Sequence, residues 1–164
     1  MRIAILLSAI AITTLLNSCS IDQAVDPKQD ELACIATLEK HLQAVTDRNI
    51  PVLLSTMSPT GEMQLILPST EIITGVAGFM EFHESWFADT TTVWSFETKI
   101  LNAKVGKELA FAVVEIIYRE PERDGKPYFN RQIVSYALQK EGKQWFVLKD
   151  HCTSIEKSTD QQSG

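Results

Sequence analysis

The sequence predicts a single α+β domain in which helices come first and two long β-hairpins follow. Amphipathic helical segments occupy the first half of the chain, at 30–48 and 75–87. The second half, from 91 to 155, is rich in β-branched and aromatic residues and is punctuated by glycines at positions typical of hairpin turns. Helices followed by a block of strands are typical of α+β folds.

Residues 1–19 form a short apolar leader with Arg2 as its only ionised side chain. A run of this length that ends in small and polar residues is typical of a secretory signal, not of a membrane span. The ending Leu16-Asn17-Ser18-Cys19 resembles a bacterial lipobox, whose cysteine becomes lipid-modified; the alternative is ordinary signal cleavage. We expect export and a lipid anchor at Cys19 in the cell envelope. Ser20 is similar to the outer-membrane sorting pattern, which would place the domain on the periplasmic side.

The segments that flank the domain are polar. Residues 20–29 lack periodicity and predict a flexible tether, and 156–164 predict a disordered tail, which leaves 30–155 as one domain. Loss of Arg2 with the leader takes the net charge from −6 to −7. An acidic chain without a basic stripe is a poor nucleic-acid binder, so we expect membrane contact through the lipid anchor only.

The helical segments carry the candidate histidines. The stripe of 30–48, with Asp30 as a plausible N-cap, has Cys34 and His41 at its margins. A short helix at 51–57 and short strands at 63–67 and 71–74 follow. In 75–87, His83 lies on the apolar stripe, where it is either a core-edge histidine held by hydrogen bonds or a functional base. Trp86 beside it belongs to the core or to a pocket wall.

Alternation along the terminal hairpin, 128–155, predicts two faces that are both largely apolar and both need cover. A two-residue turn at Gly142 fixes which residues share a face. One face carries Phe129, Arg131, Ile133, Ser135, Ala137, Phe146, Leu148, Asp150 and Cys152. The other carries Val134, Tyr136, Leu138, Trp145, Val147, Lys149 and His151. In the preceding hairpin, Glu115 interrupts an apolar run as either a pocket carboxylate or an edge charge.

Two stretches resemble the nuclear transport factor 2-like superfamily, in its SnoaL-like branch. Leu65–Trp86, LILPSTEIITGVAGFMEFHESW, is similar to that family's unit of apolar strand, glycine and amphipathic helix. The ending GKQWFVLKDHCTS is similar to the strand of SnoaL-like members and of the association domain of calcium/calmodulin-dependent kinase II, with Trp145, His151 and Thr153 at the matching positions. Arg131 resembles a strand arginine that many members turn inward.

The resemblance implies a cone-shaped, curved, mostly antiparallel sheet with about three helices on its concave face. It also assigns the Arg131, Asp150 and Cys152 face to the inside of the cone. The Trp145, Val147, Val134 and Tyr136 face would then be convex, where family members commonly pair as homodimers. A monomer at high concentration would argue against such pairing. The family hosts isomerases, dehydratases, hydrolases, binding modules and assembly domains, so the fold implies no activity.

The residues of the predicted cone indicate a ligand-binding site more clearly than they indicate a particular reaction. Its expected lining is Arg131, Asp150, His83, Trp86, Phe129, Ile133, Phe146 and Leu148. Arg131 either binds an anionic group of a ligand, with Asp150 nearby, or forms a structural ion pair with Asp150. For catalysis, Asp150, Glu115 and His83 are candidate bases and Tyr118 is a candidate acid. No metal-binding or phosphate-binding motif is present, so we expect no metal and no cofactor.

Cys34 and Cys152 remain after lipidation, either as a disulfide in an oxidising compartment or as two separate thiols. Three functions stay open. The first is binding of a small amphipathic or anionic ligand. The second is isomerase, dehydratase or hydrolase chemistry by a pocket carboxylate or histidine. The third is a dimeric interaction module without small-molecule chemistry.

Overall fold

The structure is a computed structural model that describes residues 26–159. Its three helices are α1 (Pro27–Thr46), α2 (Ile50–Leu54) and α3 (Gly75–Ala88). Its six strands are β1 (Gln64–Ile66), β2 (Ile72–Thr74), β3 (Ser95–Val105), β4 (Leu109–Arg123), β5 (Lys126–Glu141) and β6 (Gln144–Lys157). The predicted leader, the lipobox cysteine Cys19 and most of the predicted tether lie outside the described residues.

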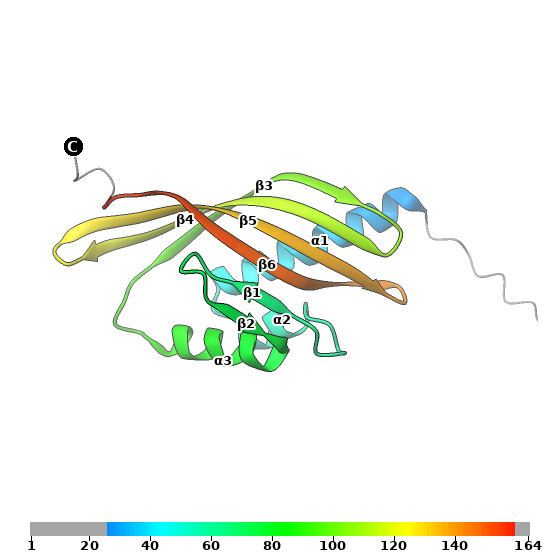
Figure 1. Cartoon of the computed structure of the whole chain (residues 1–164), viewed down its shortest axis with the longest axis horizontal. Helices are drawn as coiled ribbons and strands as arrows, with labels where there is room; N and C mark the ends of the chain where they lie inside the picture. Colours follow the sequence, from blue (N-terminus) through cyan, green and yellow to red (C-terminus); the bar gives the residue numbers. More distant parts are fainter. Residues whose placement is uncertain (1–25, 160–164) are drawn as a thin grey trace, which may run out of the picture.

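The strands form one curved, unclosed sheet in the order β2-β1-β6-β5-β4-β3. All neighbours are antiparallel except β1 and β6, which run parallel. Figure 1 shows the long strands β3 to β6 running the length of the molecule, with α3 and the β1–β2 hairpin against one side. The predicted α+β fold, with a mostly antiparallel curved sheet and three helices, is confirmed.

Element boundaries differ from the predicted ones where local capping and turn chemistry decide them. The first helix begins at Pro27, three residues earlier than expected, because the Asp26 side chain accepts a hydrogen bond from the Lys28 N–H. Residues 121–127 extend β4 and β5 as a strand pair closed by Asp124 and Gly125, both with positive φ. Asp-Gly is well suited to such a two-residue hairpin turn, because its left-handed backbone matches the twist of the flanking strands.

Helix α1 packs across the inner face of the sheet. Leu38 is fully buried on this helix, and a polar cluster holds the helix's first turns. The indole N–H of Trp145 donates to Asp30 Oδ1 at 3.0 Å, and Lys140 Nζ lies 2.6 Å from the same oxygen. These contacts lower the pKa of Asp30 and tie the helix to the β5–β6 hairpin. Asp30 is thus a link to the sheet and not the N-cap that the sequence predicted.

The predicted inner and outer faces are exchanged for β5 and for the first half of β6, although Leu138, Trp145 and Val147 do share one face as predicted. Leu138 pairs with Val147, whereas Ala137 pairs with Lys149, so Leu148 is an extra residue that forms a β-bulge. A bulge of one residue reverses the alternation of side chains beyond it. Trp145 and Val147 therefore face the helices, and after the bulge Asp150 also faces inward.

The inner face of β5 is accordingly the even-numbered one. Val134 and Tyr136, expected on the convex side, are 1% and 2% exposed and pack beneath the helices. Arg131 lies on the outer face, where its guanidinium contacts Glu115 at 2.6 Å. Sequence alternation alone could not locate the bulge that decides this.

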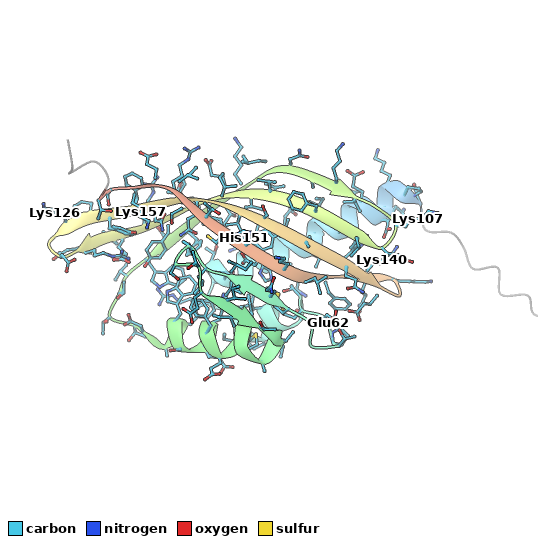
Figure 2. All side chains as sticks on the ribbon, viewed as in Figure 1. Glu62, Lys107, Lys126, Lys140, His151 and Lys157 are labelled. Carbon is cyan, nitrogen blue, oxygen red and sulfur yellow. The ribbon has the colours of Figure 1, made fainter. Side chains whose placement is uncertain are left out.

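The outer face of the sheet has no cover among the described residues. It presents Leu109 and Phe111 of β4, which are 60% and 50% exposed, while Figure 2 shows His151 on β6. Pairing of two copies through the outer face of the sheet stays a prediction, now resting on different residues. Among the helices of 26–159, none has the length and apolar character needed to cross a membrane.

Candidate functional site

A cavity of about 880 Å³ lies between the helices and the inner face of the sheet. Helices α1 and α3 supply one wall, the β1–β2 hairpin a second, and strands β3 to β6 the floor. Its walls are mainly apolar and aromatic. The aromatic part of the lining consists of Phe82, Trp86, Phe96, Tyr118, Tyr128 and Tyr136. A space of this size and character meets the general description of a small-molecule site.

Asp150 is the carboxylate in the floor of the cavity. It pairs with Tyr136 on β5 and with Leu65 on β1, so it sits in the middle of the sheet. Its Oδ1 atom is buried and has no hydrogen-bond partner. Burial raises the pKa of Asp150 to about 7, although hydrogen bonding with the Tyr136 side chain lowers it in part. An aspartate with this pKa can hold or release a proton near neutral pH.

Polar side chains continue from Asp150 along β5 and β6. The Cys152 thiol donates to Gln132 Oε1 at 2.9 Å, and both residues line the cavity. Asn130, also in the lining, is 9% exposed and its Oδ1 has no partner. Tyr136, Gln132 and Asn130 are not among the predicted site residues, because regular alternation from Asp150 puts the even-numbered residues of β5 outside. Only the position of the β-bulge could have revealed them.

Both buried histidines are neutral, and hydrogen bonds fix their tautomers. His83 Nδ1 donates to the Phe79 carbonyl at 2.8 Å, so its Nε2 is left as an acceptor in the cavity wall. The hydroxyl of Thr56 donates to the Leu53 carbonyl and therefore accepts from His41 Nδ1, at 2.9 Å. Burial lowers the pKa of His83 to about 4 and that of His41 to about 3.

A cluster around Arg123 closes the end of the cavity near the β4–β5 turn. Arg123 binds the buried carboxylate of Glu120 through Nε, at 2.8 Å, and through Nη2. The Tyr118 hydroxyl donates to the same carboxylate, and Arg123 lies over the Tyr128 ring at 3.5 Å from its centroid. Burial and the Glu120 charge raise the pKa of Tyr118 far above its usual range. Tyr118 is therefore committed to Glu120 and is a poor acid.

The structure brings only part of the predicted site together. Asp150, His83, Trp86 and Tyr118 line the cavity. Glu115 is not a pocket carboxylate, because it pairs with Arg131 on the outer face. The remaining predicted ligand residues lie outside the cavity because the bulge reversed the expected faces; they are Arg131, Phe129, Ile133, Phe146 and Leu148.

The tentative disulfide is not formed. Cys34 and Cys152 are both free, buried thiols. Burial raises the pKa of Cys34 to about 11 and that of Cys152 further still, so neither is a ready nucleophile. Within residues 26–159, no group of three or more histidine, cysteine or acidic side chains is placed to hold a metal ion.

Comparison with known proteins identifies the family. The sequence model of the SnoaL-like domain family matches residues 35–155, which is most of the chain. This chain belongs to the SnoaL-like domain family. None of the curated proteins matches the sequence of this SnoaL-like protein.

Solved structures share the fold of this SnoaL-like domain at low sequence identity. A Streptomyces avermitilis protein of the NTF2-like family, provisionally named a dehydratase, aligns with a TM-score of 0.67 and 12% identity over 79% of this chain and 99% of its own. A ketosteroid isomerase-like protein from Erwinia carotovora atroseptica aligns with a TM-score of 0.64 and 16% identity, over 76% of this chain and 95% of its own. An NTF2-like protein of unknown function from Pseudomonas putida aligns with a TM-score of 0.63 and 20% identity, over 82% of this chain and 92% of its own. At these identities the likeness shows the fold alone.

The raised pKa of Asp150 predicts how the stability of this SnoaL-like domain depends on pH. The folded state holds the proton more tightly than the unfolded chain, whose aspartate pKa is near 3.8. The stability contributed by this protonation is present at pH 4 and is lost as the pH rises to about 7. We expect the free energy of unfolding of wild type, relative to Asp150→Asn, to fall by on the order of 3 kcal/mol between pH 4 and 8.

Urea unfolding of both proteins at the two pH values measures this difference. Glu84→Gln, on the exposed side of α3, serves as the control for a general effect of removing a carboxylate. A constant difference between wild type and Asp150→Asn would show that Asp150 is solvated in the folded protein.

Proposed function

We propose that this SnoaL-like domain binds a small amphipathic molecule in the cone cavity. The apolar body of the ligand lies along the aromatic wall of α3 and β3, and its polar group reaches Asp150. The observation that carries the proposal is the combination of an apolar cavity of about 880 Å³ with a half-buried carboxylate in its floor, one oxygen of which is buried and has no partner. Buried carboxylates without a full set of partners are expensive, and they are retained most often where a ligand or substrate supplies the missing contact.

The proposal differs from the sequence hypothesis in the nature of the polar anchor. The sequence favours an amphipathic or anionic ligand, and the anionic alternative depends on Arg131 lying inside the cone. With Arg131 paired to Glu115 outside, that argument for an anion no longer applies. Asp150 and the acceptor nitrogen of His83 instead favour a ligand that donates hydrogen bonds.

Filling the cavity from its rim should weaken binding without damaging the core. Ser85 lies on α3, is exposed and lines the cavity, whereas its neighbour Glu84 is exposed and does not. We expect Ser85→Trp to weaken binding of the neutral dye N-phenyl-1-naphthylamine by at least about tenfold, and Glu84→Trp to leave it unchanged. Dye fluorescence titration measures both. Equal binding by the two variants would place the dye outside the cavity.

A second candidate function is proton transfer by Asp150, as in an isomerase or dehydratase. The specific observation that favours it is the pKa of about 7, since a general base works best when its pKa lies near the working pH. Asp150 would accept a proton from a substrate carbon next to a carbonyl and return it at another atom of the same molecule. His83 is the poorer base, because its pKa near 4 makes it weakly basic.

Proton transfer can be tested without knowledge of the natural substrate. Exchange of the α-protons of 1-indanone in D₂O, followed by NMR, reports abstraction of a carbon-bound proton. We expect wild type to accelerate the exchange and Asp150→Asn to lose roughly a hundredfold of that acceleration. The two proteins should bind the ketone equally well. Exchange that is unaffected by the substitution would exclude Asp150 as the base.

We further propose that the domain is exported and held at the envelope by a lipid on Cys19. The support is the lipobox-like ending of the leader, Leu16-Asn17-Ser18-Cys19. In Figures 1 and 2 the start of α1 lies at the end of the sheet marked by Lys107 and Lys140. Arg123 pairs with Lys126 and Tyr128 lies two residues further along β5, so both cavity residues belong to the opposite end of the sheet, where Figure 2 labels Lys126.

The lipid anchor predicts a defined labelling result. Cells that express the full chain should incorporate radioactive palmitate into the protein, and Cys19→Ser should remove the label. The same substitution should move the protein from the membrane fraction to the soluble fraction. Equal labelling of both proteins would contradict modification at Cys19.

A further inference from the structure

The charged groups that line the cavity are mainly acidic. Among the described residues, Asp150, Glu71 and Glu81 contribute carboxylates to the lining, and Arg123 contributes the one guanidinium. The charge of Arg123 is already matched, because two of its nitrogens bind the buried carboxylate of Glu120. His83 is neutral. The cavity therefore has a negative charge that no side chain of its lining balances.

The charges are also separated along the cavity. Asp150 pairs with Tyr136, whereas Arg123 lies over the ring of Tyr128, eight residues away on β5. An extended strand rises about 3.3 Å per residue, so these positions are roughly 26 Å apart along the strand. Glu71 and Glu81 come from the β1–β2 hairpin and from α3, are solvent-exposed, and mark where the cavity opens. A ligand thus meets carboxylates at the opening and again at the floor.

The wall between these carboxylates is aromatic. Trp86 stacks on Trp94 at 4.6 Å between ring centroids and 19° between planes, and it also contacts Phe82 and Phe96. Such a wall accommodates a flat apolar body. Because the faces of aromatic rings carry partial negative charge, it also tolerates a cation that passes along it. A cleft with low-dielectric walls and charges of one sign concentrates ions of the opposite sign.

We propose that the ligand of this cavity is an amphipathic cation, a protonated amine on a flat apolar body, whose ammonium group binds Asp150. The inference rests on the proposed function, since it names the class of ligand for the same cavity. An ammonium group only donates hydrogen bonds, and the carboxylate of Asp150 and His83 Nε2 only accept them. An anion of the same shape would face uncompensated carboxylates, and a neutral ligand would leave the charge of Asp150 unpaired.

Three probes with the same ring system and different charge test the inference. They are 1-naphthylmethylamine, 1-naphthalenemethanol and 1-naphthoic acid, titrated into the wild-type domain by calorimetry at pH 8. We expect the amine to bind at least about tenfold more tightly than the alcohol, as a charge-assisted hydrogen bond in a partly buried site provides. The acid should bind most weakly. In Asp150→Asn, the amine should lose its advantage over the alcohol.

The rim carboxylates allow a matched comparison on one helix. Glu81 and Glu84 are both exposed residues of α3, and only Glu81 lines the cavity. Glu81→Gln should weaken binding of the amine, with an effect that shrinks at high salt, and Glu84→Gln should not. Equal effects of the two substitutions would mean that the amine responds only to the net charge of the domain, which would overturn the inference.

The pH dependence gives an independent readout. The titratable groups that act on Asp150 are Tyr136 and Cys152, and His83 lines the same cavity; none of the three changes charge between pH 6 and 8. Binding of the amine should therefore strengthen as the pH rises through about 7, the pKa of Asp150. Asp150→Asn should remove this dependence. Binding of a neutral ligand that accepts a hydrogen bond from the protonated carboxyl of Asp150 would instead weaken as the pH rises.

The outcomes separate the two proposals. If the alcohol binds wild type as tightly as the amine does, the inference about charge is wrong and cavity binding stands. If the acid binds most tightly, the same conclusion holds. If none of the three probes binds wild type, the proposed function itself is contradicted, and the inference fails with it.

Discussion

The β-bulge at Leu148 is the constraint on which the arrangement of the site depends. Before the bulge, Trp145 and Val147 face the helices, and Trp145 is tied to Asp30 of α1. Beyond it, the inserted residue turns Asp150 inward. With regular alternation, a strand that buries Trp145 would present Asp150 to the outer face. The bulge allows one strand both to anchor the first helix and to place a carboxylate in the cavity.

Asp150 has an environment that stability alone does not explain. It lies in the middle of the sheet, with one oxygen buried and unpartnered, and its ionised form is disfavoured by burial. A hydrophobic residue of similar size at this position would avoid that cost. Structural ion pairs of the protein lie elsewhere, at Asp30 with Lys140 and at Glu115 with Arg131. A local conflict with stability in the floor of an apolar cavity is typical of a functional position.

The two buried histidines illustrate how hydrogen bonds decide chemical roles. Each donates a hydrogen bond from its Nδ1–H. The acceptor is the Phe79 carbonyl for His83 and the Thr56 hydroxyl for His41. Burial then keeps both rings neutral. His41 serves packing against Phe79 and Tyr136, whereas His83 presents an acceptor to the cavity. Two histidines of similar burial thus differ in what they present to the cavity.

The sequence by itself determined the α+β fold, the order of its helices and strands, and the family, because these depend on hydrophobic periodicity, glycine turns and recognisable local stretches. It also singled out Asp150, His83 and Trp86, which the structure brings to one cavity. The tertiary structure alone decided which face of β5 lies beneath Asp150, because a single residue inserted in β6 reverses the side chains of β6 beyond it relative to β5. For this reason the sequence could place neither Arg131 on the outside nor Tyr136, Gln132 and Asn130 within the cavity.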